Sequence, residues 1–193
     1  MTKTFVLSMH RCGTRSVSEF LDAHGFRVRH CPKMFDGVDH QNIVRLREND
    51  LDFVARWLKR IFDEYEVISD VPVPVIYRQL MEMYPEARFI LVIRPAADWV
   101  KSVRRHCGGR EFKPFERCQY WAYVKGRPDS IDAISDAALG RAFHKHTEAV
   151  VREIPRERLG VFHLYAGDLG DRILRFMGAS YGAEFPHVNG GGE

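Results

Sequence analysis

The chain has 193 residues, of which 45% are hydrophobic and 28% charged, and its formal net charge is +3 at pH 7. These values predict one globular domain, residues 1–193, with a substantial core, and the charge is too small to favour nucleic-acid binding. No apolar run is long enough to span a membrane, and no secretory leader is expected. The four cysteines form no C-x-x-C pair, which disfavours a zinc knuckle or a disulfide framework. We therefore expect a cytoplasmic protein that binds neither nucleic acid nor membrane.

Residues 5–21 are predicted to form a strand, a polar turn and a helix. The apolar run 5–7 is long enough for a buried strand, and Val17, Phe20 and Leu21 recur at helical spacing. In this arrangement backbone N–H groups and a helix N-terminus converge on an anion. The turn suits a phosphate or a sulfonate, because it holds a glycine, two cations and two hydroxyls: Gly13, Arg11, Arg15, Thr14 and Ser16. The alternative is an ordinary turn that happens to be basic.

This turn differs from two well-known phosphate-binding loops. A Walker A loop carries lysine after its second glycine and then a hydroxyl that holds Mg²⁺. Here Thr14 and Arg15 stand at those two positions. A cysteine phosphatase loop, C-x5-R, would need arginine where this chain has Ser18 after Cys12. We therefore predict a phosphate-binding loop that needs no metal ion.

The next predicted strands bring a carboxylate to the same edge of the sheet. The expected elements are a second strand at 26–30, a loop at 33–38, a short helix at 39–47 and a longer amphipathic helix with Asp50 as its N-cap. A third strand, residues 65–69, is followed by Asp70 and then by two prolines. Asp70 therefore lies at the carboxyl end of a strand, where open α/β sheets bind their ligands.

A continuous apolar run predicts the fourth strand, residues 88–93, which is followed by Arg94 and Pro95. Pro95 suits the first position of a helix, and Trp99 lies on the apolar face of that helix. Ser102 lies on another face, two turns up the helix. A guanidinium and a hydroxyl in these positions can hold one anion between them.

The remainder of the chain completes an alternation of strands and helices. Residues 106–126 are basic and aromatic, which indicates either a mobile flap over the site or a partly buried helix. A long helix is predicted from Ser130 to the residue before Pro155, then a fifth strand at 159–164 and a last helix that ends at Gly178. This order predicts an α/β fold, with a five-stranded parallel sheet between two layers of helices.

Two of these motifs resemble those of the PAPS-dependent sulfotransferases, which use 3′-phosphoadenosine-5′-phosphosulfate. The phosphosulfate loop of that family reads [KR]-x-G-[ST]-[ST], and residues 11–16 match it except at Arg15. The family's 3′-phosphate site is an arginine at a strand end and a serine eight residues later, as in Arg94 and Ser102, although Pro95 lacks the aspartate that usually precedes it. The sequence F-P-H-x-N at 185–189 resembles the tail of a short branch of the family, in which His187 and Asn189 would be candidates to face the site.

The resemblance implies a single sulfotransferase domain with a fold like that of P-loop nucleotide kinases. It implies that the loop binds the phosphosulfate of PAPS, that Arg94 and Ser102 bind the 3′-phosphate, and that Arg11 stabilises the group being transferred. The implied loop ligands are Arg11, Cys12, Gly13, Thr14, Arg15 and Ser16. Where the cytosolic branch has its basic histidine, in T-H-x-P, this chain has S-D-V-P, so Asp70 is the expected base. The acceptor would be a small molecule or a glycan with a hydroxyl or an amine.

Two other interpretations stay open at this point. In a P-loop nucleoside or nucleotide kinase, V-I-S-D would be a Walker B strand and Asp70 would hold Mg²⁺, but the missing loop lysine argues against it. A nucleotide-binding module without turnover is also compatible with the unusual Arg15 and Pro95. Such a module would bind adenosine 3′,5′-bisphosphate (PAP) and transfer no sulfate.

Overall fold

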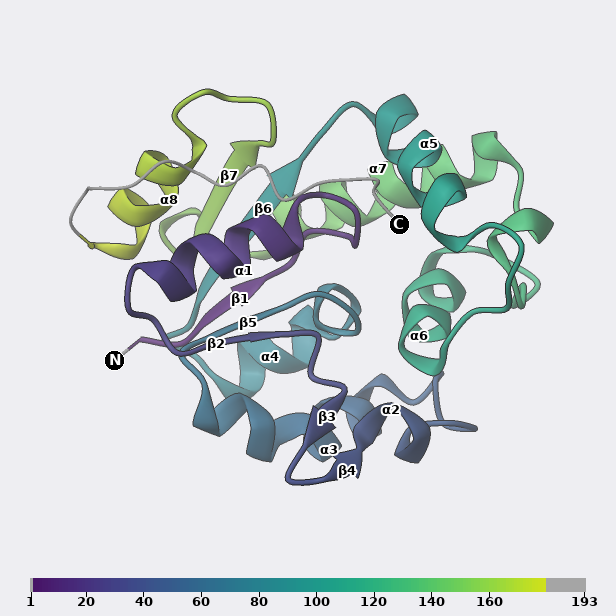
Figure 1. Ribbon diagram of the computed structural model, residues 1–193, viewed down its shortest axis with the longest axis horizontal. Coiled ribbons are helices and arrows are strands. Elements are labelled where there is room, and N and C mark those ends of the chain that lie inside the picture. Colours follow the sequence, from purple (N-terminus) through teal and green to yellow (C-terminus); the bar gives the residue numbers. More distant parts are fainter. Residues whose placement is uncertain (1, 180–193) are drawn as a thin grey trace.

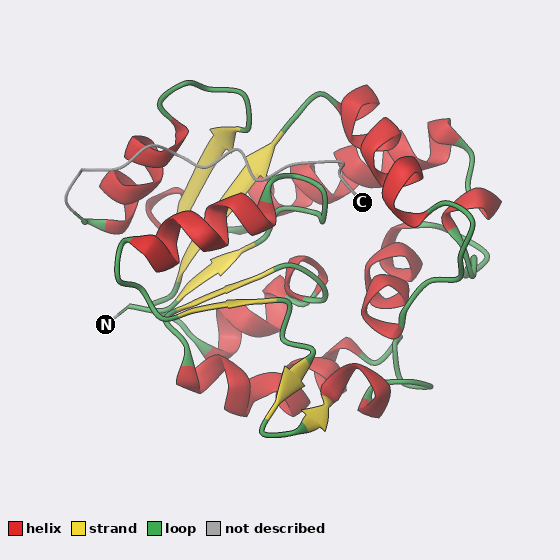
Figure 2. Cartoon of the chain, viewed as in Figure 1, coloured by secondary structure: helices red, strands yellow, loops and turns green. Residues whose placement is uncertain are grey.

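A computed structural model describes residues 2–179 of the chain. Its centre is a five-stranded sheet in which every neighbouring pair is parallel, with the order β2-β5-β1-β6-β7 (Figure 1). The strands are β1 (Thr4–Val6), β2 (Val28–His30), β5 (Val67–Ser69), β6 (Arg88–Ile93) and β7 (Leu159–His163). The predicted fold class is confirmed, since helices cover both faces of this sheet (Figure 2).

Alternate side chains of the central strand enter two different cores. Phe5 and Leu7 belong to the core on one face, together with the buried sides of α3, α4 and α7. Val6 points the other way, into a core shared with α1 and α8. Side chains of the neighbouring strands complete both cores. Because these short strands are buried on both faces, their sequences are continuous apolar runs. Burying one such side chain fully stabilises the fold by about 1.5–3 kcal/mol.

Helices occupy the connections between the strands of the sheet, and α8 follows the last strand. They are α1 (Thr14–Ala23), α2 (His40–Ile43), α3 (Leu51–Glu64), α4 (Tyr77–Met83), α5 (Ala96–Cys107), α6 (Pro114–Tyr123), α7 (Asp136–Glu153) and α8 (Leu169–Met177), with short 3₁₀ turns η1 (Val73–Val75), η2 (Ile131–Ala133) and η3 (Arg156–Arg158). Asp50 caps α3 as predicted, since its carboxylate accepts the Phe53 N–H at 2.9 Å. Gly178 ends α8 in the left-handed conformation that its position predicts.

A third apolar cluster lies beyond the carboxyl ends of the strands, where α5 and α6 stand in Figure 1. Trp99 and Phe143 pack at its centre, with ring centroids 5.0 Å apart. Two residues that follow β1, Met9 and Cys12, are buried in this cluster and not in the cores of the sheet. The segment after β1 is therefore packed between the sheet and a separate group of helices.

Four local expectations need correction. The predicted loop at 33–38 contains a small antiparallel hairpin, β3 (Met34–Phe35) and β4 (Val38–Asp39). Pro95 is the N-cap of α5 and not its first residue. The long helix begins at Asp136, because Ser135 provides the capping hydroxyl and Ser130 precedes only a 3₁₀ turn. Residues 114–123 form a helix whose aromatic side chains are largely buried, which supports the helix over the flap.

Within residues 2–179, no helix is long and apolar enough to cross a membrane.

Candidate active site

The loop between β1 and α1 has the backbone shape of an anion cradle. Arg11 and Gly13 both adopt left-handed conformations, with φ of 67° and 74°, and α1 begins at the next residue, Thr14. The first N–H groups of a helix have no partner within the helix, and left-handed residues just before them turn successive N–H groups toward one point. The predicted loop therefore has a geometry that suits a phosphate or a sulfonate.

Contacts from two neighbouring elements fix this loop. The Val92 N–H donates to Ser8 Oγ at 2.7 Å, which ties the end of β1 to β6. The indole Nε1 of Trp99 donates to the His10 carbonyl at 2.9 Å, and the His10 ring is hydrogen-bonded to Tyr120 Oη at 2.6 Å. Burial lowers the pKa of His10 to about 4, so this ring is neutral at neutral pH and acts as a structural group.

The predicted second anion site meets the loop at Arg11. Arg11 Nε donates to Ser102 Oγ at 3.3 Å, and Arg94 donates to the Arg11 carbonyl at 3.0 Å and to Tyr165 Oη at 2.5 Å. Arg94 and Ser102 thus lie on two sides of Arg11. Arg94 Nε is buried and has no hydrogen-bond partner among the described residues. A buried guanidinium N–H without a partner costs free energy, which an anion placed there would recover.

The other predicted loop residues occupy different environments. Cys12 is fully buried, and burial raises the pKa of its thiol to about 12, which excludes a thiolate nucleophile at neutral pH. Thr14 and Ser16 are buried on the first turn of α1. The side chain of Arg15 is 70% exposed and pairs with Glu19 at 2.9 Å. Cys12 and Arg15 can therefore contribute to the cradle mainly through their backbone.

Asp70 lies where the sequence predicts it, directly after β5, and in an uncommon conformation. Its φ is 69°, in the left-handed region. Its Oδ1 is buried without a hydrogen-bond partner in the described part of the chain, while Oδ2 lies 3.5 Å from Nε2 of His30. Sequence reasoning missed His30. The available signal was its position as the last residue of a strand, because the carboxyl ends of parallel strands share one edge of the sheet.

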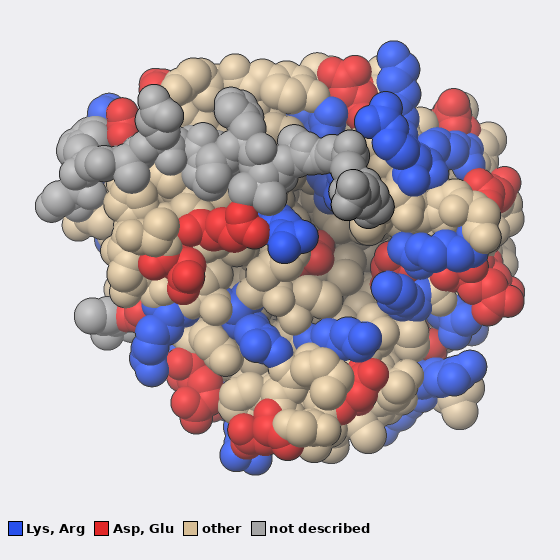
Figure 3. Space-filling view, in the orientation of Figure 1, with Lys and Arg blue, Asp and Glu red and all other residues tan. Residues whose placement is uncertain are grey.

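One face of the molecule is hollowed and carries several basic side chains. Figure 3 shows a hollow near the middle of the face in view, with Lys and Arg side chains on either side of it. In Figure 1 the same part of the view lies between α6 and the loop that follows β5. A concave surface with several cations attracts an anionic ligand and raises its local concentration.

Comparisons with known proteins identify the family of the chain. The model of the sulfotransferase domain family matches residues 3–193. The chain belongs to this family. Ava biosynthesis cluster protein M from Aspergillus versicolor is 23% identical to this sulfotransferase-family protein over 215 residues, which cover 96% of the chain and 80% of the relative.

Two solved structures share its fold. The sulfotransferase from Alicyclobacillus acidocaldarius superposes with a TM-score of 0.59 at 14% identity, over 100% of this chain and 87% of that one. The sulfotransferase domain from the curacin biosynthetic pathway superposes with a TM-score of 0.54 at 10% identity, over 98% and 78% of the two chains. At these identities the two structures show the fold alone.

Two further features of this sulfotransferase-family protein lie outside the anion loop. His10, Cys107 and Glu116 are buried with polar atoms within 4.8 Å of one another, but Glu116 accepts two hydrogen bonds from Arg110 and one from the Lys113 N–H. A cation already occupies the place that a metal ion would take, so we interpret this cluster as a structural network.

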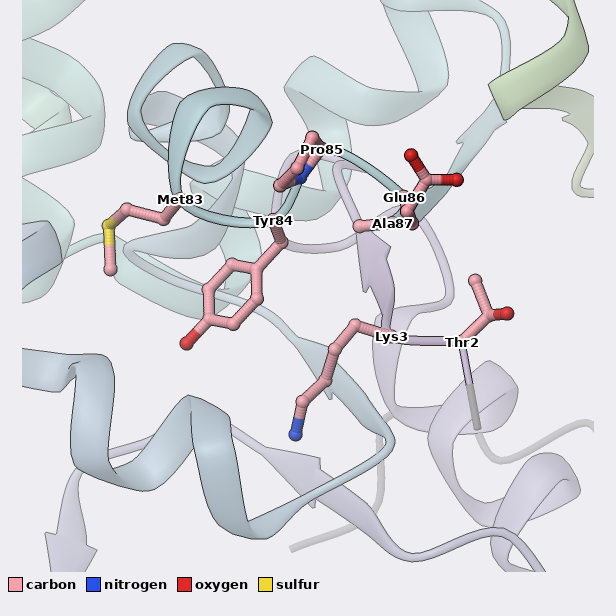
Figure 4. Close-up of a pocket in the computed structure, with 7 residues that line it drawn as sticks. All are labelled: Thr2, Lys3, Met83, Tyr84, Pro85, Glu86 and Ala87. Atoms are coloured by element: carbon pink, nitrogen blue, oxygen red, sulfur yellow. The ribbon is translucent and has the colours of Figure 1, made fainter.

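A second hollow, of about 470 Å³, lies at the opposite end of the sheet (Figure 4). Its lining residues precede β1 and β6: Thr2, Lys3, Met83, Tyr84, Pro85, Glu86 and Ala87. Lys3 Nζ donates to the carbonyls of Phe62, Asp63 and Tyr65, at 2.6–2.7 Å. Lys3 therefore caps the C-terminus of α3, so we interpret its place in this hollow as structural.

His187 and Asn189, which the resemblance makes candidates to face the site, lie outside the described residues.

Proposed function

We propose that this protein transfers a sulfonate group from PAPS to a hydroxyl, or to an amine, of a small-molecule or glycan acceptor in the cytoplasm. PAP would be the second product, and no metal ion would take part. The observation that carries the proposal is the position of Arg11 between Arg94 and Ser102. Arg11 belongs to a loop suited to one anion and contacts Arg94 and Ser102, which suit a second anion. A cofactor with a 5′-phosphosulfate and a 3′-phosphate requires two such sites close together.

The residues present fit such a ligand. The backbone of residues 11–16 would hold the 5′-phosphosulfate, because the left-handed Arg11 and Gly13 precede the N-terminus of α1. Arg94 would hold the 3′-phosphate through the N–H groups that now bond the Arg11 carbonyl and Tyr165, and through its unpartnered Nε. Ser102 would complete this second site once Arg11 turns toward the loop.

When bound, PAPS supplies an activated sulfonate and a good leaving group. Arg11 would stabilise the negative charge that grows on the oxygen bridging sulfur and phosphorus, once its guanidinium turns from Ser102 toward the loop. Asp70 would take part in removing the acceptor's proton, because its carboxylate lies at the carboxyl end of β5, on the edge of the sheet where the loop between β1 and α1 also begins.

The kinase interpretation has less support. Thr14 and Arg15 stand where a kinase loop has its lysine and its Mg²⁺-binding hydroxyl, and the family assignment favours sulfonate transfer.

Ligand-dependent thermal unfolding tests the proposal. PAP at a hundredfold its Kd should stabilise the protein by about 2.7 kcal/mol, whereas ATP with Mg²⁺ should have little effect. Arg94→Ala should lose most of the response to PAP. Arg56→Ala is the matched control, because it removes one exposed positive charge from α3 and should respond like the wild type.

Transfer of labelled sulfate separates an enzyme from a binding module. With [35S]PAPS and a pool of phenols, alcohols and oligosaccharides, we expect label in at least one acceptor and less of it with Arg11→Ala. Stabilisation by ATP and Mg²⁺ in place of PAP would overturn the proposal. Binding of PAP without transfer to any acceptor, or to water, would leave only the binding module.

A further inference from the structure

We propose that Nε2 of His30 is the atom that receives the acceptor's proton, and that Asp70 holds the resulting imidazolium. This inference rests on the proposed function and names a catalytic residue for it. His30 and Asp70 end neighbouring parallel strands, and their side chains are 31% and 15% exposed. Both side chains are therefore accessible to an acceptor at this edge of the sheet.

A chain of hydrogen bonds connects the other nitrogen of His30 with the anion loop. His30 Nδ1 lies 2.9 Å from Ser69 Oγ, which lies 2.6 Å from Ser18 Oγ. Ser18 in turn donates to the Thr14 carbonyl at 2.8 Å. Thr14 is the first residue of α1 and one of the proposed cofactor ligands, so the chain runs from the histidine to the loop.

Counting protons along this chain assigns the tautomer of His30. Ser18 has one hydroxyl proton, which it must donate to the Thr14 carbonyl because a carbonyl oxygen can only accept a hydrogen bond. Ser69 must therefore donate its own proton to Ser18 Oγ, and its oxygen is left to accept from His30. Nδ1 of His30 consequently carries the ring proton, and Nε2 has a free lone pair. Both serines are almost completely buried, so water does not compete for these bonds.

The surroundings of Nε2 suit a base that gains a proton during the reaction. Burial lowers the pKa of His30, and the carboxylate of Asp70 opposes this effect. The ring is therefore neutral at neutral pH, as a base must be. Once protonated, it faces a carboxylate oxygen 3.5 Å away, which stabilises the new charge. Arg15 and Glu19, on the adjacent turn of α1, contribute opposite and weaker effects.

The proposed step moves one proton and one sulfonate group. The hydroxyl of the acceptor gives its proton to His30 Nε2 while its oxygen lone pair forms the new bond to sulfur. The bond between sulfur and the bridging oxygen breaks, and that electron pair stays on the phosphate of PAP next to Arg11. Imidazolium and Asp70 carboxylate then form an ion pair, and the proton passes to solvent when the product leaves.

Nuclear magnetic resonance of the ring nitrogens tests the tautomer without any acceptor. Histidine labelled with ¹⁵N gives signals for nine residues, and His30→Gln identifies the signal of interest by its absence. At pH 7.5 we expect a protonated Nδ1 and an unprotonated Nε2. In Ser18→Ala the hydroxyl of Ser69 is released to donate to Nδ1, so the other tautomer should grow. A wild-type protein with its proton on Nε2 would overturn the proposal.

Kinetics with water as the acceptor test the catalytic role. General base catalysis contributes roughly 10²–10⁴-fold, so release of [35S]sulfate from PAPS by His30→Gln should fall about a hundredfold or more. The thermal stabilisation of His30→Gln by PAP should equal that of the wild type. His24→Gln is the matched control, because this histidine lies at the far end of α1, bonded to the Phe20 carbonyl.

The outcomes separate the two proposals. Normal turnover and an unchanged pH profile in His30→Gln would refute the role of His30 and leave the proposed function intact. A wild-type protein that neither responds to PAP nor releases sulfate would refute the proposed function itself.

Discussion

Replacing Gly13 by alanine tests the geometry of the anion loop. Gly13 has a φ of 74°, and a Cβ added to it would lie 2.5 Å from Cδ1 of Leu164. A left-handed conformation costs a residue with a Cβ about 1–2 kcal/mol. Cδ1 is the end of a flexible side chain, so it can move aside for about 0.5–1.5 kcal/mol of rotamer strain. We therefore expect Gly13→Ala to lower the free energy of unfolding by about 1.5–3.5 kcal/mol, the sum of these two contributions, and to weaken PAP binding.

Urea unfolding followed by tryptophan fluorescence measures this loss of stability. A variant at Leu164 separates the backbone contribution from that of the side-chain contact, and a variant at Gly140 is the control. Leu164→Val removes the obstructing atom, so Gly13→Ala in that background should cost only about 1–2 kcal/mol, which is the backbone contribution. Gly140→Ala is the control, because a Cβ added to this helical glycine would have no described atom within 4 Å. This variant should be more stable than the wild type by up to about 1 kcal/mol. The reasoning fails if Gly13→Ala is as stable as the wild type, or if Leu164→Val restores all of the loss.

Three further changes probe the surroundings of the site. Burial lowers the pKa of both His10 and His146 to about 4, below the ordinary 6.5, so the unfolded state binds more protons between these values and stability is lost as pH falls. Each should contribute about 2 kcal/mol of destabilisation at pH 5, and His146→Gln should flatten the urea-derived pH profile by its share. Trp99→Phe leaves the buried His10 carbonyl without its indole donor, so it should cost about 1–3 kcal/mol and weaken PAP binding in thermal-shift titrations. Glu153→Gln removes the carboxylate that accepts from Arg78 and Tyr77, and since Arg78 is 56% exposed, calorimetry should show a loss of only about 1 kcal/mol.

The positions of the strands along the chain, and several of the residues that follow them, were accessible from the sequence. Residues 88–93 form β6 with the predicted bounds, because a run of large apolar residues buried on both faces leaves little choice of structure. Arg94, Asp70 and the anion loop then follow from their positions after strands. The assignment of PAPS and of individual roles to these residues remains a prediction.

The remaining features depend on contacts between distant parts of the chain. Nothing local in the sequence indicates that Arg11 would lie between Arg94 and Ser102, since the two hydrogen bonds span 83 and 91 residues. His30 was missed because a lone histidine in a basic strand has no spacing motif. The hairpin β3–β4 was missed because two-residue strands are shorter than any periodicity can reveal.

The burial of Met9 and Cys12 in the helical cluster has a consequence for how the protein loses function on heating or in denaturant. The loop between β1 and α1 is anchored to a helical unit whose apolar cluster is distinct from the two cores of the sheet, although α6 and α7 also contribute side chains to one of those cores. Local opening of that unit would release the loop while the sheet persists, because cooperative units within one domain can open separately. Hydrogen exchange in the native state should then show the amides of α5 and α6 opening at lower free energy than those of β1 and β6, and binding of PAP should slow the exchange of the helices first.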